Sequence, residues 1–252
     1  MAGNPVVLGV LQTVVSGLAG QTGRAALDIV DAGGGTGGFA VPLASLGHHV
    51  TVVDPSPDSL AAAQRRAAEQ DVPLRAVQGD AADLASLAGE QSADLVLCHS
   101  VLEYVDSPAA AMAAIAAVLR PGGAVSVLTA SAVAAVIHRA LAGRFDEARR
   151  LLTGIGAAAP NGDGSGPADG RPPQPGPGPR RFTLAGVTGL IEQAGLRPGP
   201  AQGVRVFADL VPRVVADADP GAAQALQGLE LAVSVHPAFH DFAAQFHVLG
   251  YR

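Results

Sequence analysis

The stretch Leu27–Asp54, LDIVDAGGGTGGFAVPLASLGHHVTVVD, constrains the fold of this chain more than any other. An apolar segment ends at Asp31, a run of glycines follows, and a helical segment leads to a second apolar segment that ends at Asp54. Glycine permits a tight turn and a close approach of the backbone to a ligand, and the amino end of a helix is electropositive. This order predicts half of a nucleotide-binding α/β fold.

The rest of the first half continues the alternation of apolar strands and helices. Strict alternation predicts a doubly wound parallel sheet with right-handed crossovers. The expected strands are residues 26–30, 50–53, 74–78, 93–98, 124–128, at least one within 196–210 and most clearly 204–208, and 245–251. The expected helices are residues 38–46, 56 or 57 to 69, 108–119, 182–194 and 220–234. We expect a single domain over residues 1–252.

Two segments depart from the alternation. Residues Gly156–Pro179 are rich in glycine and proline without apolar periodicity, which predicts a disordered loop inside the domain. Residues Val6–Ala19 are apolar, but no basic residue precedes them and Gln12 and Thr13 interrupt the run. A secretory signal needs a basic start, and a membrane span needs about 20 apolar residues. We expect a helix packed on the domain.

Charge and cysteine content limit the partners and the compartment. The chain has 16 basic residues, all arginine, against 22 acidic ones, and its net charge of −6 argues against general binding to nucleic acid or membranes. Residues 131–185 alone are net positive, with 7 arginines against 4 acids, which indicates either a solvated surface or a docking site for an anionic substrate. The single Cys98 excludes an internal disulfide and fits a cytoplasmic protein.

Acidic residues around the glycines separate the cofactor classes. Asp31 lies directly before them, where a carboxylate would repel a pyrophosphate but suits the ammonium of a methionine moiety. Asp54 is placed to accept hydrogen bonds from ribose hydroxyls. Gly79–Asp83 follows the third strand, where a turn can contact an adenine edge, and Leu119–Gly123 reads LRPGG. Together these motifs resemble the class I S-adenosyl-L-methionine-dependent methyltransferases. A P-loop is excluded, because no Gly-Lys-Ser/Thr follows the glycines.

A narrower resemblance covers most of the chain outside the Pro/Gly-rich loop. Residues 93–108, ADLVLCHSVLEYVDSP, and residues 203–210, GVRVFADL, are similar to the bacterial family that methylates the carboxylate of 5-carboxymethoxyuridine at the tRNA wobble position. The resemblance implies a Rossmann-like, doubly wound, seven-stranded and mostly parallel sheet with an antiparallel last strand and helices on both faces. It also implies S-adenosyl-L-methionine as the cofactor and tRNA as the acceptor, with a small anionic molecule as the other possibility.

The candidate cofactor site combines residues from the motifs with residues implied by the family. In the family, the residues matching Gly33, Gly34, Asp54, Ala81, Ala82 and His99 bind the cofactor. The full predicted set is Asp31, Gly33, Gly34, Gly35, Asp54, Asp80, Ala81, Ala82 and His99. His99 follows the fourth strand, at the sheet edge where α/β proteins bind ligands, so we expect a hydrogen bond to cofactor or substrate, or else a core histidine.

His99 and Arg205 are the candidate catalytic residues. Arg205 lies in a segment expected to be an apolar strand, and a buried arginine needs a partner. It can pair with Asp209 or Glu230, or hold a substrate carboxylate with its planar guanidinium. No metal site is expected, since the C-terminal histidines lack metal-ligand spacing with nearby acids.

If the acceptor is a carboxylate, it is ionised near pH 7 and needs no general base, so catalysis would be positioning plus electrostatics.

Three other functions remain open. A small-molecule O-methyltransferase is the first alternative. A nicotinamide-dependent oxidoreductase is disfavoured by Asp31 and by the absence of lysine from the chain. A non-enzymatic cofactor-binding domain is suggested by Val6 and Val7, which lie near the position where the family has an arginine.

Overall fold

The computed structural model describes residues 4–155, 179–216 and 220–252, so the predicted loop at 156–179 lies outside the described residues except for its last position. The described residues form one seven-stranded sheet in the order β3-β2-β1-β4-β5-β7-β6. Its strands are β1 (Asp28–Ala32), β2 (His49–Asp54), β3 (Arg75–Gln78), β4 (Ala93–His99), β5 (Leu119–Ala130), β6 (Arg197–Val204) and β7 (Gln245–Tyr251).

Strand directions place six carboxyl ends at one edge of the sheet. Strands β3, β2, β1, β4 and β5 run parallel, and β7 is antiparallel to both β5 and β6. Strand β6 therefore points the same way as β5. The predicted doubly wound, mostly parallel sheet with an antiparallel last strand is confirmed.

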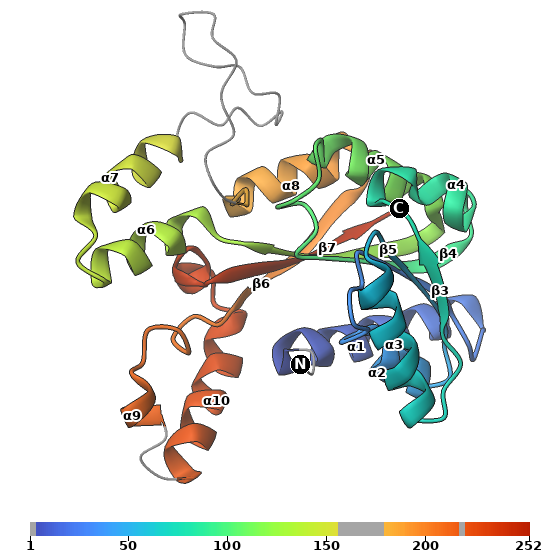
Figure 1. Cartoon of the computed structure of the whole chain (residues 1–252), viewed down its shortest axis with the longest axis horizontal. Coiled ribbons are helices and arrows are strands. Elements are labelled where there is room, and N and C mark those ends of the chain that lie inside the picture. The colour runs from blue at the N-terminus through green and yellow to red at the C-terminus, as the bar shows by residue number, and fades with distance from the viewer. Residues whose placement is uncertain (1–3, 156–178, 217–219) are drawn as a thin grey trace, which may run out of the picture.

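Helices cover both faces of the sheet (Figure 1). On one face lie α4 (Leu84–Ala88), α5 (Pro108–Val118) and α8 (Leu184–Gln193), and on the other lie α1 (Pro5–Thr22), α2 (Ala40–Ser45) and α3 (Pro57–Glu69). The remaining helical elements are α6 (Ala132–Leu141), α7 (Phe145–Gly154), α9 (Arg213–Ala216), α10 (Pro220–Ser234) and the 3-10 turns η1 (Ala81–Asp83) and η2 (Pro237–Phe242). The sequence patterns did not predict α4, α6, α7 or α9.

Side-chain caps explain where several helices begin. Asn4, Ser56 and Ser107 each accept a hydrogen bond from a backbone amide two or three residues on, at 2.9, 3.2 and 3.2 Å. Proline follows each cap directly, where its missing N–H costs little. The predicted start of α3 at Ser56 or Pro57 is confirmed, with Ser56 as the cap and Pro57 as the first helical residue.

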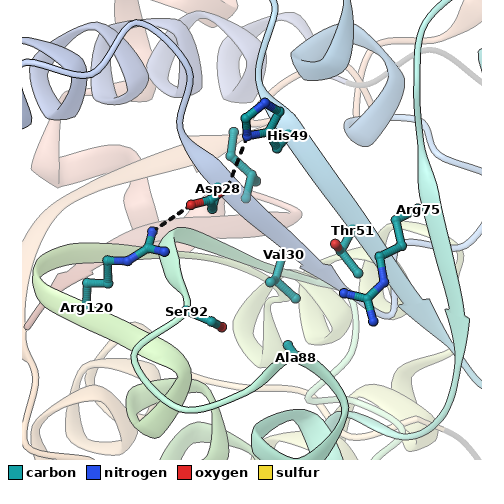
Figure 2. A pocket seen from close by; sticks show the side chains of 9 residues that line it. Asp28, Val30, His49, Thr51, Arg75, Ala88, Ser92 and Arg120 are labelled. Atoms are coloured by element: carbon teal, nitrogen blue, oxygen red, sulfur yellow. Dashed lines mark hydrogen bonds and ion pairs between the residues drawn. The ribbon is translucent and has the colours of Figure 1, made fainter.

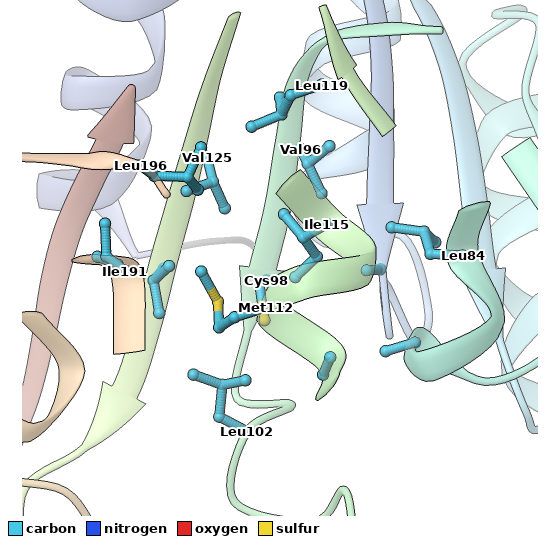
Figure 3. Close-up of a cluster of buried hydrophobic side chains, with 14 of the residues drawn as sticks. Leu84, Val96, Cys98, Leu102, Met112, Ile115, Leu119, Val125, Ile191 and Leu196 are labelled. Atoms are coloured by element: carbon cyan, nitrogen blue, oxygen red, sulfur yellow. The ribbon is translucent and has the colours of Figure 1, made fainter. Parts of the chain in front are cut away.

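The central strand β4 lies between two apolar layers. All seven of its residues are buried. Figure 3 shows the layer formed with α4, α5 and α8, in which Val96 and Cys98 lie near Met112 and Ile115 of α5. Fully burying a side chain such as Met112 or Ile115 contributes about 1.5–3 kcal/mol. This packing fixes the position of the strand that ends at His99.

Helix α1 forms part of the opposite layer. By length and composition it is the one helix in the described ranges that could cross a membrane. Its apolar side chains recur at helical spacing, and those at Val6, Val7, Leu11, Val15 and Leu18 are buried against residues of β1, β2 and α2. The prediction of a helix packed on the domain is confirmed.

Two strand boundaries differ from the prediction. Strand β5 begins at Leu119 and so includes the LRPGG motif, with a register irregularity opposite Ala93. Strand β6 covers Arg197–Val204, so the strand expected within residues 196–210 is confirmed, but its favoured position at 204–208 is wrong. It lies at the end of the sheet, where prolines are tolerated because one side of the strand has no partner to receive a hydrogen bond. The chain leaves the sheet at Arg205, which has a φ of +58°.

Candidate functional site

The glycine loop joins β1 to α2. Gly33 and Gly35 have φ values of +67° and +53°, in the left-handed region that favours glycine. A Cβ at Gly33 would overlap the Val101 side chain, and a Cβ at Gly34 would lie 2.6 Å from Asp31 Oδ2. Contacts on both sides of the loop therefore exclude a side chain at Gly33 and Gly34.

Asp54, the last residue of β2, holds this loop in place through hydrogen bonds. Its Oδ2 accepts a hydrogen bond from Gly35 N at 2.9 Å, and its Oδ1 accepts one from Ser56 N at 2.9 Å. Each carboxylate oxygen has two lone pairs, so both oxygens can accept a further hydrogen bond. Two vicinal hydroxyls of a ribose fit this capacity.

Asp31, near the end of β1, is buried beside the glycines with an exposed fraction of 2%. Burial and the nearby charge of Asp54 raise the pKa of the Asp31 carboxyl to about 7. A cation bound next to it would favour the ionised form. The site therefore suits a positively charged group.

Asp80 follows β3 and forms the neighbouring turn. Its side chain accepts a hydrogen bond from Ala82 N at 3.0 Å and so caps η1, in which Ala81 is buried. Since β1, β2 and β3 are adjacent and parallel, their carboxyl ends bring Asp31, Asp54 and Asp80 to one edge. The structure thus gathers the predicted cofactor residues there, and their roles stay predictions.

His99, the last residue of β4, lies at the same edge with 9% of its surface exposed. Its Nε2 lies 2.8 Å from Ser126 Oγ, and its ring packs edge-on against Phe39 with the centroids 4.5 Å apart. Its Nδ1 is buried and has no hydrogen-bond partner among the residues that the structure describes. Burial, with a smaller effect of His247, holds the pKa of His99 well below 6.5. His99 is therefore anchored through one nitrogen and unpartnered at the other.

Two more unpartnered polar atoms lie near the ends of β4 and β5. Glu103 is buried, and its Oε1 accepts a hydrogen bond from Ala130 N at 2.7 Å, whereas Oε2 has no partner within the described part of the chain. Burial raises the pKa of the Glu103 carboxyl. Thr129 Oγ1 is likewise buried and unpartnered there. Neither residue belongs to the predicted site, although polar residues within apolar runs could have signalled them.

Arg205 differs from its prediction in burial and in secondary structure. It follows β6 instead of lying in a strand, and its side chain is 51% exposed. It forms an ion pair with Asp209, the first of its proposed partners. Its second proposed partner, Glu230, instead accepts hydrogen bonds from the backbone amides of residues 206–208. Arg205 lies at the carboxyl edge, but its surroundings are those of a surface ion pair.

An open pocket of about 270 Å³ lies at the opposite, amino edge of the sheet (Figure 2). Asp28 forms an ion pair there with Arg120 at 3.0 Å, and its Oδ1 lies 3.2 Å from His49 Nδ1. Although burial raises the pKa of Asp28, hydrogen bonds from Arg24, His49 and Arg120 hold it below its usual value. None of the predicted site residues lines this pocket.

Part of the chain matches a family of known proteins. Residues 30–127 match the family model described as a methyltransferase domain. The chain contains a methyltransferase domain. The matched range begins in β1 and ends in β5, so it includes the glycine loop, Asp54, the Asp80 turn and His99. The prediction of a class I methyltransferase is confirmed for this domain.

Two curated proteins that match the chain have different names. The chain is 35% identical over 128 residues to the tRNA 5-carboxymethoxyuridine methyltransferase of Escherichia coli K12, which covers 50% of this chain and 49% of that protein. It is 37% identical over 126 residues to the ubiquinone biosynthesis O-methyltransferase of Aeromonas salmonicida, covering 50% of each. The alignments thus span about half the length of these relatives.

Solved structures match over a longer range. A SAM-dependent methyltransferase from Methanosarcina mazei matches with a TM-score of 0.59 and 14% identity, over 100% of this chain and 99% of that one. Magnesium protoporphyrin IX methyltransferase from Synechocystis PCC 6803, solved with bound SAH, matches with a TM-score of 0.55 and 18% identity, over 97% and 84%. At these identities the similarity supports the fold alone, and it confirms the Rossmann-like prediction.

Proposed function

We propose that this chain is an S-adenosyl-L-methionine-dependent methyltransferase. The observation that carries the proposal is the row of Asp31, Asp54 and Asp80 at the carboxyl ends of three adjacent strands around the glycine loop. In this assignment, Asp31 receives the ammonium of the methionine moiety, Asp54 the ribose hydroxyls, and the Asp80 turn the adenine. A dinucleotide would instead bring a pyrophosphate to the buried Asp31 carboxyl, which electrostatics disfavours.

We propose further that the acceptor is the carboxylate of 5-carboxymethoxyuridine at the wobble position of tRNA. The name of the Escherichia coli relative and the net positive charge of residues 131–185 support this acceptor. When bound, the cofactor supplies an electrophilic methyl group that leaves its sulfonium for a carboxylate oxygen. The protein has to align the acceptor and exclude water, and no residue has to remove a proton.

A second candidate is O-methylation of a hydroxyl on a small molecule. The name of the Aeromonas relative and the unpartnered Glu103 Oε2 favour it. A hydroxyl, unlike a carboxylate, must lose its proton as the new bond forms, and a carboxyl whose pKa is raised by burial is suited to receive it. In this case Glu103→Gln abolishes transfer, whereas a carboxylate acceptor tolerates that change.

Methyl transfer into separated cell fractions tests the proposed function. The purified protein is incubated with methyl-labelled cofactor and with tRNA, protein or small-molecule extracts, and the tRNA arm includes tRNA bearing the oxyacetate. We expect label in tRNA with a base-labile ester linkage. Asp54→Ala serves as the inactive variant, and Asp58→Ala, an exposed aspartate on α3, is its matched control. Label confined to the small-molecule fraction contradicts the tRNA proposal, and no label in any fraction contradicts transfer itself.

A further inference from the structure

A continuous chain of polar side chains crosses four adjacent strands on one face of the sheet. Gln202 Oε1 of β6 lies 2.7 Å from His247 Nδ1 of β7, and His247 Nε2 lies 2.7 Å from Ser126 Oγ of β5. Ser126 Oγ lies 2.8 Å from His99 Nε2 of β4. All four side chains are buried, with exposed fractions of 9% or less. We call this chain Gln202–His247–Ser126–His99 the polar relay.

The strand register explains the alignment of the polar relay. His247 is opposite Gln202 on one side and Leu128 on the other, and Leu128 is opposite His99. Side chains at paired positions share a face, and Ser126 lies two residues before Leu128 on that same face. The two histidines therefore meet at the Ser126 hydroxyl.

The chemistry of the end residue gives the relay a direction. The Gln202 carbonyl oxygen can only accept, so His247 Nδ1 must carry the proton and donate it. A neutral imidazole carries one proton, so His247 Nε2 accepts the hydrogen bond of the Ser126 hydroxyl. Ser126 Oγ in turn accepts from His99 Nε2–H, which leaves His99 Nδ1 without a proton.

The surroundings of His99 independently give the same direction. Its Nδ1 is buried without a partner in the described residues. A buried N–H without an acceptor is among the rarest groups in folded proteins, whereas an unfilled acceptor site is better tolerated. Burial also lowers the pKa of His247 to about 4 and that of His99 well below 6.5, so both rings are neutral at pH 7.

From this geometry we infer that Gln202, acting through His247 and Ser126, fixes His99 in the tautomer whose Nδ1 accepts a hydrogen bond from a donor group of the bound ligand. The inference rests on the proposed function for the ligand, since the donor is either the ammonium of the cofactor or a hydroxyl of the acceptor. Gln202 is thus a positioning residue more than one side chain removed from the site. An ionised carboxylate has no proton to donate, so His99 does not hold a carboxylate acceptor.

The tautomer is measured directly by two-bond ¹⁵N–¹H correlation on the unliganded protein labelled in its histidines, with the His99 signals identified by their loss in His99→Gln. We expect a protonated Nε2 and a bare Nδ1 on His99 in the wild type. Ser126→Ala and Gln202→Met break the relay at separate points, and each should give His99 a mixture of tautomers. Ser126→Thr keeps the hydroxyl and should keep the wild-type tautomer.

Two results overturn the inference. One is a protonated Nδ1 on His99 in the wild type, and the other is an unchanged tautomer in both Ser126→Ala and Gln202→Met. Because the protein is unliganded, this outcome is independent of whether the proposed function holds. Failure of the wild type to bind S-adenosylhomocysteine contradicts the proposed function and leaves the tautomer result standing.

Ligand binding identifies the donor. S-adenosylhomocysteine carries the ammonium, whereas 5′-methylthioadenosine lacks it. If the donor is the ammonium, Ser126→Ala weakens the binding of S-adenosylhomocysteine about tenfold, as expected for one lost hydrogen bond, and leaves the affinity for methylthioadenosine unchanged. Ser126→Thr then keeps the wild-type affinity for both compounds. If the donor is an acceptor hydroxyl, cofactor affinity is unchanged and kcat/KM for the acceptor falls instead. Equal affinity and equal transfer in all variants overturn the role in ligand binding.

Discussion

Asp31 shows how burial and function conflict at a single residue. Its carboxyl is enclosed by the glycine loop and lies near the charge of Asp54, and both raise its pKa to about 7. The folded pKa lies above the usual value of about 3.9, so this residue stabilises the unliganded fold least above pH 7. The shift in pKa corresponds to a decrease in the free energy of unfolding on the order of 4 kcal/mol between pH 4 and pH 7. A bound ammonium would recover this cost.

We predict that affinity for S-adenosylhomocysteine rises with pH up to about 7 and then levels off. Below pH 7 the Asp31 carboxyl is largely protonated, so binding the ammonium must release that proton. Calorimetry at pH 6 in buffers of different ionisation enthalpy measures the proton release. In Asp31→Asn the release and this pH dependence should both disappear. An identical pH profile in the two proteins would contradict the assignment of Asp31.

Gly34 in the loop and Gly17 on helix α1 offer a matched pair of substitutions by alanine. Gly34→Ala places a methyl group 2.6 Å from the Asp31 carboxylate, so the loop or Asp31 must move. We predict a stability loss of about 1–3 kcal/mol and at least about tenfold weaker cofactor binding. Gly17 lies on the exposed side of helix α1 with nothing within 4 Å of the position that a Cβ would take, so Gly17→Ala should stabilise the protein by about 0.5–1 kcal/mol. Urea denaturation and calorimetry on both variants decide whether the effect is specific to the loop.

Secondary elements could be predicted from the sequence where local patterns determine them. Buried parallel strands such as β4 read as continuous apolar runs, and capped helices such as α3 show a serine followed by proline. The sequence predicts a strand within residues 196–210 but favours the wrong part of it, because RPGPAQGV has the composition of a turn and the apolar VRVFA begins only at the last residue of β6. Its position depends on pairing with β7, about 45 residues later, which no local pattern contains.

Glu230 on α10 determines the path of the chain after β6. Its carboxylate accepts hydrogen bonds from Val206 N at 2.9 Å, Phe207 N at 2.7 Å and Ala208 N at 2.6 Å. We predict that Glu230→Ala lowers the free energy of unfolding by about 3 kcal/mol, since three amides lose their acceptor. Glu230→Gln, which keeps one acceptor oxygen, should lose less.

Urea denaturation measures both variants of Glu230. Glu192→Ala, the same change at an exposed site on α8, is the control and should stay within about 0.5 kcal/mol of the wild type. A Glu230→Ala variant as stable as this control would show that the loop does not depend on the carboxylate.

At the scale of the whole molecule, the two edges of the sheet have different chemistry. The carboxyl edge gathers the glycine loop, the acids and His99, whereas the amino edge has an ion cluster in which Asp94 contacts Arg24 at 2.7 Å and Arg120 at 3.0 Å. The acids of the carboxyl edge follow recognisable strands and could be predicted. The polar relay could not, since its members are separated by 27, 121 and 45 positions and meet only through the order β4-β5-β7-β6.

This separation predicts that stability and binding can be changed independently. Asp94 is 3% exposed, and Asp94→Ala leaves two arginines and the Asp28 amide without their shared acceptor. We expect a stability loss of about 2–3 kcal/mol with unchanged affinity for S-adenosylhomocysteine at a temperature where the variant is folded. A matching loss of affinity would show that the amino edge takes part in binding.

Calorimetry with S-adenosylhomocysteine measures whether the glycine loop and Asp54 bind the cofactor. We predict binding to the wild-type protein at one site per chain. Binding should be at least about a hundredfold weaker in Asp54→Ala, which loses two ribose hydrogen bonds, and unchanged in Asp58→Ala. No binding to the folded wild type, or equal affinity in Asp54→Ala, would contradict the assignment of the glycine loop and Asp54 as the cofactor site.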